Sequence, residues 1–139
     1  MTKDTGVQDV LDVPESYQRY LDEIYNITYK KKKGGWVSNK EIAEALQVNP
    51  ASVSEMLDKL KKKGLISWEQ RKAIRLTKYG KEIAEHLSSV HKLLNEFFEK
   101  VLKIEDRELI NELSCQIEHH ITKEVKISLE RFLNQYLIK

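Results

Sequence analysis

The chain has 139 residues, which is enough for one domain of ordinary size, or for a small domain with a dimerisation extension, and for a real core. Its composition of 33% charged and 40% hydrophobic residues, with five glycines, two prolines and one cysteine, favours a helix-rich fold and excludes a disulfide scaffold and a four-cysteine zinc module. No apolar run approaches the roughly 18 residues that span a bilayer, and no signal peptide is evident, so we expect an intracellular, cytoplasmic protein with no membrane partner.

Positive charge is concentrated in one segment, although the formal net charge of the chain is only +2. Residues 59–81 contain nine basic residues and one acidic residue, whereas residues 91–139 contain eight basic and nine acidic residues. A basic patch in a nearly neutral protein indicates a polyanionic partner. Charge alone is equally consistent with a solvated basic face that has no partner. The secondary structure that carries the patch distinguishes these two interpretations.

Two short helices joined by a tight turn are expected after an amphipathic first helix. Ser38 and Glu41 form a capping-box pair, in which each side chain satisfies a free amide of the other residue. Asn49 and Pro50 supply a cap and a first-turn proline for a second helix over residues 50–63. A helix, a three-residue turn and a helix are typical of the helix-turn-helix motif.

Two strand-like runs follow, 65–68 and 73–76, on either side of the basic segment 69–72. This pattern predicts a β-hairpin directly after the second helix of the motif, which is the wing of a winged helix. The tip of the wing would lie on phosphate, where Arg71 and Lys72 bind without reading base sequence. The capping box, the turn and the basic wing together indicate a protein that binds double-stranded DNA.

DNA-contacting residues are expected near the start of the second helix of the motif, off its apolar side, with others at the start of the first helix and in the wing. Serine bonds either phosphate or base, and Glu55 can accept from a cytosine amino group, although it is also explained as a helix former near the positive dipole end. No arginine lies on this helix, so we expect DNA shape to contribute to specificity. The predicted DNA-binding residues are Ser38, Lys40, Ala51, Ser52, Ser54, Glu55, Lys59, Arg71 and Lys72.

A long helix is expected from residue 78 to residue 101 or 102, with one continuous apolar face. His91 falls in the middle of that face, whereas His86 points the other way. A histidine on an apolar face is usually a hydrogen-bonded core residue, and a role as a metal ligand is the alternative.

The next expected helix, 106–122, carries further metal-binding residue types. Cys115, Glu118 and His119 stand at positions i, i+3 and i+4 and therefore share one face. Thiolate, carboxylate and imidazole groups can together bind a divalent transition metal if other elements complete the site. His120 falls within the apolar stripe and is expected in packing or at an interface. The alternative is a half-buried cysteine beside surface residues, a combination that arises by chance.

Several motifs together make the chain resemble a known family. They are YLDEIY at 20–25, EIAEAL at 41–46, VS at 53–54, LTKYG at 76–80 and CQIEHH at 115–120, and the last of these is the most specific. On these segments the chain resembles the metal-dependent repressors of the diphtheria toxin repressor and manganese transport regulator family, and it is closer to the manganese type in length. The resemblance covers about residues 17–137.

The resemblance implies a metal site and its ligands. Cys115, Glu118, His119 and His91 match the primary metal ligands of the family, and Asp22 matches the first-helix carboxylate of the manganese-type regulators. The implied cofactor is a divalent transition metal, Fe²⁺, Mn²⁺ or Zn²⁺. A cysteine ligand favours Fe²⁺, Co²⁺ or Zn²⁺ over Mn²⁺ in raw affinity.

Arg19 departs from the family pattern, because it stands where members have a methionine or aspartate ligand and a guanidinium cannot bind a cation. Asn95 and Asn111 stand where the iron-type repressors have a glutamate and a histidine of a second site. A single site that lacks one usual ligand is therefore favoured over a two-metal site. Alternatively, Arg19 replaces the charge of the cation by pairing with Glu118, which leaves the protein permanently competent for DNA.

We therefore predict a mostly α fold with a small β-hairpin wing: a winged helix-turn-helix DNA-binding domain over residues 1–77 and a helical dimerisation and metal-binding domain over residues 78–139. The resemblance implies a transcriptional repressor, not an enzyme, that binds a palindromic operator as a homodimer when metal links its first helix to the dimerisation helices. Dimerisation is also expected because the C-terminal region has more large apolar side chains than it can cover alone. They are Ile117, Ile121, Val125, Ile127, Leu129, Phe132, Leu133, Tyr136 and Leu137.

Two other functions are consistent with the sequence. One is a metal-independent winged-helix DNA-binding protein with a vestigial metal site, whose DNA affinity would be unchanged by a chelator. The other is a thiol enzyme that uses Cys115 with His119 or His91. It lacks any oxyanion-hole or substrate-loop signal and would need an exposed cysteine with a depressed pKa.

Overall fold

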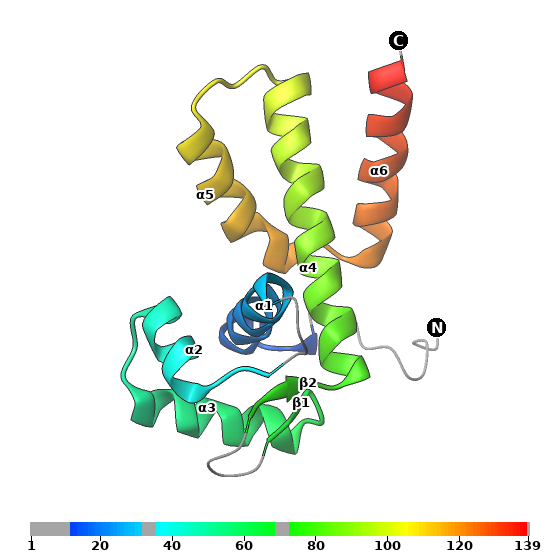
Figure 1. Ribbon diagram of the computed structural model, residues 1–139. Helices are drawn as coiled ribbons and strands as arrows, with labels where there is room; N and C mark the ends of the chain where they lie inside the picture. The colour runs from blue at the N-terminus through cyan, green and yellow to red at the C-terminus, as the bar shows by residue number, and fades with distance from the viewer. Residues whose placement is uncertain (1–11, 32–35, 69–72, 139) are drawn as a thin grey trace. The chain divides into compact units, whose positions relative to one another are not determined.

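The computed structural model describes residues 12–31, 36–68 and 73–138, and these residues are mostly helical with a short two-stranded sheet (Figure 1). They divide into two compact units, Pro14–Glu85 and a second unit made mainly of His86–Lys139, with the boundary inside one helix. None of the described helices combines the length and apolarity needed to cross a membrane. In chain order the elements are α1 Glu15–Lys30, α2 Asn39–Leu46, α3 Pro50–Lys62, β1 Ile66–Ser67, β2 Arg75–Leu76, α4 Lys78–Glu96, the π-helical turn η2 Phe97–Val101, α5 Arg107–Ile117, the 3₁₀ turn η3 Glu118–His120 and α6 Lys123–Ile138.

In the unit Pro14–Glu85, α1, α2, α3 and the strands pack against one another (Figure 1), and their buried apolar side chains form the core. Burial of several large aliphatic side chains, each worth about 1.5–3 kcal/mol, holds α2 and α3 in a fixed relation to α1. The helix-turn-helix with a following hairpin confirms the predicted fold class. The fully buried side chains include Leu21, Ile24, Ile42, Val53, Leu57, Leu60, Leu65 and Ile74.

Local sequence sets the ends of α2 and α3 as predicted. Ser38 Oγ accepts from the Glu41 amide at 3.1 Å and the Ser38 amide donates to Glu41 Oε1 at 2.9 Å, which confirms the capping box. Asn49 Oδ1 accepts from the Ser52 amide at 3.0 Å and caps α3. Gln47, with φ +56°, makes the left-handed turn between the two helices.

The hairpin is shorter than the sequence predicts, because each strand has two residues. Val37, immediately before the N-cap of α2, adds an isolated antiparallel bridge to Ile74, with N···O distances of 3.1 and 2.8 Å. The sequence does not predict this bridge, because a single bridging residue produces no alternating pattern. The predicted tip, residues 69–72, lies outside the described residues. The paired residues of β1 and β2 are Ile66 with Leu76 and Ser67 with Arg75.

The first turn of α4 lies against the chain that leaves α3. Thr77 Oγ1 accepts from the Gly80 amide at 3.1 Å and donates to the Gly64 carbonyl at 2.7 Å, while the Thr77 amide donates to the Leu65 carbonyl at 3.1 Å. A Cβ at position 80 would lie 2.0 Å from Leu65 O, so the approach requires glycine. This contact fixes the base of the wing to α4.

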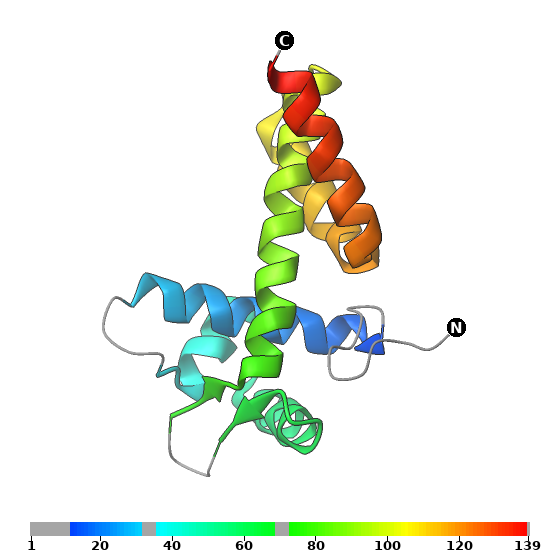
Figure 2. The same ribbon diagram turned by 90° about the vertical axis from the view of Figure 1, so that its right-hand side faces the viewer.

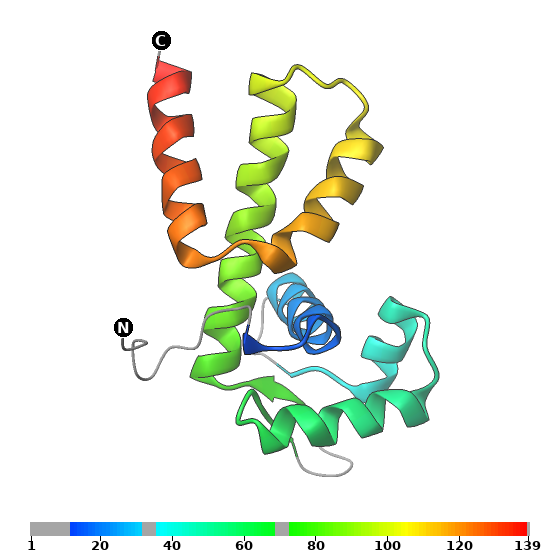
Figure 3. The same cartoon turned by 180° about the vertical axis from the view of Figure 1, so that it is seen from behind.

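In the unit His86–Lys139, the C-terminal half of α4 lies between α5 and α6, as Figures 1 and 3 show from opposite sides and Figure 2 from the side of α6. The Phe97 ring of η2 lies 6.2 Å from the Phe132 ring of α6. The buried apolar residues here are Leu87, Val90, Leu94, Ile110 and Leu133.

The buried face of α4 differs from the predicted one. His91, predicted in the middle of the apolar face, has a side chain that is 26% exposed, whereas His86, predicted to point away, is only 9% exposed. The His86 ring donates from Nε2 to the Ile121 carbonyl at 2.8 Å. The prediction was wrong because α4 is covered by α5 on one side and α6 on the other, so its buried surface is wider than one stripe.

The predicted continuous helix 106–122 is also wrong at its C-terminal end. α5 ends at Ile117, and the next three residues form a 3₁₀ turn with fewer residues per turn. This tightening buries Glu118 and His119, each 2% exposed, and leaves His120 exposed rather than packed in the apolar stripe. The three predicted ligands of this segment therefore do not stand on one α-helical face.

Candidate nucleic-acid interface and metal centre

The outer side of α3 presents polar residues near its N-terminus. Val53, Leu57 and Leu60 are fully buried, and Ser54 is half-buried at the edge of the buried face. Because these apolar residues face the core, the start of the helix, at its positive dipole end, is open to an anionic partner. The predicted DNA-contacting residues that are exposed on α3 are Ala51, Ser52, Glu55 and Lys59.

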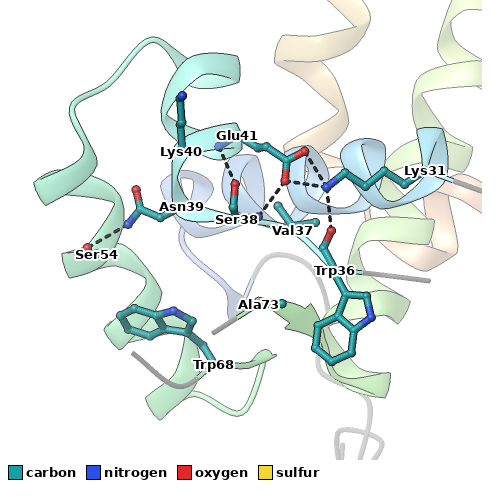
Figure 4. Close-up of a pocket in the computed structure, with 10 residues that line it drawn as sticks. All are labelled: Lys31, Trp36, Val37, Ser38, Asn39, Lys40, Glu41, Ser54, Trp68 and Ala73. Carbon is teal, nitrogen blue, oxygen red and sulfur yellow. Dashed lines mark hydrogen bonds and ion pairs between the residues drawn. The ribbon is translucent and has the colours of Figure 1, made fainter. Parts of the chain in front are cut away.

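The start of α2 lies beside α3 and adds further polar groups to this surface (Figure 4). Ser38 and Lys40 are both exposed. They line a groove of about 710 Å³ together with Trp36, Ser54 and Trp68, so α2, α3 and the base of the hairpin share one surface. The two wing residues predicted to contact phosphate, Arg71 and Lys72, lie outside the described residues.

Lys31, at the end of α1, is bound to the start of α2. Its Nζ donates to Glu41 Oε1 at 2.7 Å and to the Trp36 carbonyl at 3.0 Å (Figure 4). The hydrogen bond from Lys31 holds the pKa of the Glu41 carboxyl below its ordinary value of 4.5, and the Ser38 groups of the capping box lower it further. The sequence does not predict this contact, because Lys31 stands in a run of lysines that has no informative spacing.

Two of the predicted metal ligands are in direct contact. His91 Nδ1 of α4 lies 2.6 Å from Glu118 Oε1 of η3, and His91 Nε2 lies 2.7 Å from Asn111 Oδ1 of α5. Both partners are oxygens, so the ring makes both bonds as a donor only when it carries two protons. The imidazolium then offsets the charge of a carboxylate that is 2% exposed.

The other predicted ligands of this unit lie close in sequence to that pair. His119 is buried beside Glu118 in η3, and Cys115, which forms no disulfide, is half-buried one turn earlier on α5. Nitrogen, oxygen and sulfur donors of this kind suit a divalent transition metal. Among the residues that the structure describes, no group of three or more His, Cys, Asp and Glu side chains is arranged to hold a metal ion.

The two predicted first-helix residues lie on α1, in the unit Pro14–Glu85. Asp22 is half-buried. Arg19 is exposed and forms an ion pair with Glu15 on its own helix, at 2.6 Å between Arg19 Nη2 and Glu15 Oε2. The assignment of Asp22 as a ligand stays a prediction.

A winged helix-turn-helix with an open polar recognition surface, followed by helices that pair a histidine with a buried carboxylate, defines the class of DNA-binding transcriptional regulators. Residues 12–74 match the iron dependent repressor N-terminal DNA binding domain, and residues 77–137 match the iron dependent repressor metal binding and dimerisation domain. The chain therefore belongs to the iron dependent repressor family of metal-dependent transcriptional regulators, which are not enzymes.

Individual relatives agree with this assignment. The chain is 36% identical over 107 residues to the HTH-type transcriptional regulator MntR of Oceanobacillus iheyensis, which covers 77% of this chain and 69% of the relative. It is similar to the solved structure of the manganese regulator SloR, with 31% identity and a TM-score of 0.69 over 85% of this chain. It is also similar to ScaR with bound Zn²⁺, with 28% identity and a TM-score of 0.70 over 85% of this chain. The chain spans about half the length, 53%, of each of these two structures.

These findings confirm the predicted family, whose members are metal-dependent transcriptional repressors, and the mostly helical winged-helix fold. They support a divalent metal as cofactor and DNA binding with dimerisation as properties of the family.

Proposed function

We propose that this protein represses transcription as a homodimer that binds a palindromic DNA operator when a divalent metal occupies the site around Glu118. The observation that carries the proposal is the buried Glu118 carboxylate paired with His91 at 2.6 Å, in the segment that matches the family's metal-binding domain. A buried carboxylate needs a cation close to it. A divalent metal would supply such a cation.

The donor set of this unit fits a transition metal. Cys115, Glu118, His119 and His91 would hold the ion, and Asp22 is the proposed ligand from α1 on the grounds of the family resemblance. When bound, the ion supplies a double positive charge that favours ligands from more than one element. Asn111 accepts from His91 Nε2 at 2.7 Å, so it orients the ring and leaves Nδ1 facing Glu118.

On DNA, we propose that α3 enters the major groove and that Lys59, Arg71 and Lys72 bind phosphates. Ser38 and Lys40 would contact the backbone from the start of α2 because they share the groove beside α3. Direct contacts to bases would come from Ala51, Ser52, Ser54 and Glu55.

The homodimer is supported by α6. Leu133 is its only buried residue among the described ones, although the helix carries many large apolar side chains. Exposed apolar area of this kind is typical of an interface between copies of a chain. The large apolar residues that are exposed on α6 are Val125, Ile127, Phe132, Tyr136, Leu137 and Ile138.

We propose Fe²⁺, Mn²⁺ or Zn²⁺ as the metal. Similarity to a manganese regulator and to a zinc-bound relative supports this range, and Cys115 favours the softer ions in raw affinity. A regulator of this kind acts on the bacterial chromosome or its equivalent, so we place it in the cytoplasm.

The experiment is a fluorescence-anisotropy titration of DNA enriched from a random duplex library by the wild-type protein. We expect the affinity to fall at least tenfold with a chelator and to return when Mn²⁺, Fe²⁺ or Zn²⁺ is added in excess. Glu118→Gln should remove this response, whereas Glu112→Gln, at an exposed position on α5, should keep it. An identical metal response in both variants would refute the assigned site.

A specific observation favours one alternative, a metal-independent DNA-binding protein with a vestigial site. Both ring nitrogens of His91 already contact protein oxygens, so the pair with Glu118 is satisfied without metal. In that case the DNA affinity is the same with chelator and with added metal, and Glu118→Gln changes only the stability of the protein.

A further inference from the structure

Asn39, the first residue of α2, reaches across to the recognition helix α3. Its Nδ2 donates to Ser54 Oγ at 2.9 Å and lies 3.3 Å from the carbonyl of Pro50, one turn earlier on α3 (Figure 4). The bond to Ser54 is partly buried. Asn39 thus binds two points on α3 that are four residues apart.

The direction of this hydrogen bond follows from its second partner. The Pro50 carbonyl can only accept, so the amide nitrogen of Asn39, and not its oxygen, must face α3. The opposite orientation would place two oxygens against each other. Asn39 Oδ1 accordingly faces away and has no hydrogen-bond partner among the described residues.

The Ser54 hydroxyl therefore accepts from the protein and keeps its own proton. A serine in a helix commonly donates that proton to the carbonyl four residues earlier, which here is the Pro50 carbonyl. Here Asn39 Nδ2 lies 3.3 Å from that carbonyl, and the Ser54 hydroxyl accepts from Asn39 without bonding to the carbonyl. Within the described part of the chain, no acceptor takes the proton of Ser54 Oγ.

Ser54 stands where DNA would meet this surface. It lines the groove of about 710 Å³ between α2, α3 and the hairpin, and also a smaller hollow of about 390 Å³ beside Trp68. Figure 4 shows its side chain next to Asn39, on the side of α3 that faces the start of α2. A partner that enters the groove passes this hydroxyl.

We propose that Asn39 is a positioning residue that holds Ser54 Oγ with its proton directed to a hydrogen-bond acceptor on DNA. The inference rests on the proposed function, because it needs DNA in the groove. The acceptor is a phosphate oxygen or an acceptor atom on a purine or thymine edge. Without Asn39, the hydroxyl turns to the Pro50 carbonyl and its proton is withdrawn from DNA.

The test is a double-mutant cycle measured by DNA affinity, with Mn²⁺ present, on duplexes enriched from a random library by the wild-type protein. We expect Asn39→Ala to weaken binding about fivefold in the wild-type background, the usual effect of one hydrogen bond. In the Ser54→Ala background the same change should have no effect. Ser52→Ala, an exposed serine on the same helix, is the matched control, and its effect should add to that of Asn39→Ala.

A second variant keeps the test valid if Asn39→Ala weakens the start of α2. Asn39→Asp has the same shape, but its carboxylate takes the proton of Ser54. Asn39→Asp should therefore abolish the contribution of Ser54 to DNA affinity. The new negative charge also repels DNA, but this effect is the same with and without Ser54, so the double-mutant cycle with Ser54→Ala cancels it. Circular dichroism of every variant checks the fold.

The possible outcomes distinguish a phosphate acceptor from a base acceptor. They also distinguish failure of this inference from failure of the proposed function. Coupling on both the enriched and a random-sequence duplex assigns a phosphate acceptor, and coupling on the enriched duplex alone assigns a base. Additive effects of Asn39 and Ser54 on both duplexes would overturn the inference while leaving DNA binding intact. If the wild-type protein binds neither duplex, the proposed function is refuted, and this inference with it.

Discussion

Replacement of Gly80 by alanine should destabilise the DNA-binding unit at the base of the wing. A Cβ at this position would lie 2.0 Å from the Leu65 carbonyl oxygen and 3.0 Å from its carbonyl carbon, both of which are backbone atoms that cannot rotate away. The two segments must separate by about 1 Å to reach a tolerated contact. That movement lengthens the bond from the Thr77 amide to the Leu65 carbonyl, now 3.1 Å, and the bond from Thr77 Oγ1 to the Gly64 carbonyl, now 2.7 Å.

The expected cost follows from these contacts. Loss of two hydrogen bonds costs about 2 kcal/mol, and insertion of a methyl group into a packed site costs about 1–3 kcal/mol. The better helix propensity of alanine offsets about 1 kcal/mol. We expect Gly80→Ala to lower the free energy of unfolding by about 2–4 kcal/mol, a large share of the 5–15 kcal/mol typical of a small domain.

Urea denaturation followed by circular dichroism, at one fixed protein concentration, measures this difference. Gly64→Ala is the matched control, because a Cβ there meets no atom within 4 Å but the backbone has φ +75°. It should cost only the left-handed strain, about 1–2 kcal/mol. A Gly80→Ala protein within 0.5 kcal/mol of wild type would refute the reasoning, since it would show that the segments part without loss.

Three further predictions concern function and pH. His119→Ala should lower the affinity for Co²⁺, measured by calorimetry, at least about tenfold. His120→Ala should leave this affinity unchanged, because the His120 side chain is exposed. Equal losses in the two variants would contradict the assignment of His119, and not His120, as a metal ligand. Lys59→Ala should weaken binding to all DNA sequences alike and flatten the slope of log K against log salt by about one unit, and an unchanged slope would show that Lys59 contacts no phosphate. The pKa of Glu41 is lowered in the folded state by Lys31, so the ion pair stabilises the fold above the ordinary carboxyl pKa and is lost as the pH falls through the lowered value. The stability difference between wild type and Lys31→Met should therefore be under about 1 kcal/mol at pH 7 and vanish in acid, and a difference that persists at pH 2 would contradict this assignment.

The features of this protein that depend on neighbours along the chain can be predicted from its sequence. Ser38 and Glu41 form their capping box, and Asn49 caps α3, because the atoms involved are three residues apart and meet whenever a helix begins there. The family motifs of the C-terminal half belong to the same class of information, since they lie within short segments. They were sufficient to predict a metal-dependent winged-helix repressor.

Which helix faces are buried, and which distant side chains come into contact, depends on the packing of whole helices. His86 is buried and His91 is partly exposed because α5 and α6 cover α4 from two sides, which the periodicity of α4 cannot reveal. The bond from Asn39 to Ser54 and the pair of His91 with Glu118 join residues 15 and 27 positions apart, whose contact depends on how whole helices pack. A helical wheel treats each helix as isolated and regular, so it also could not predict the 3₁₀ turn after Ile117. In that turn His119 is buried and the adjacent His120 is exposed.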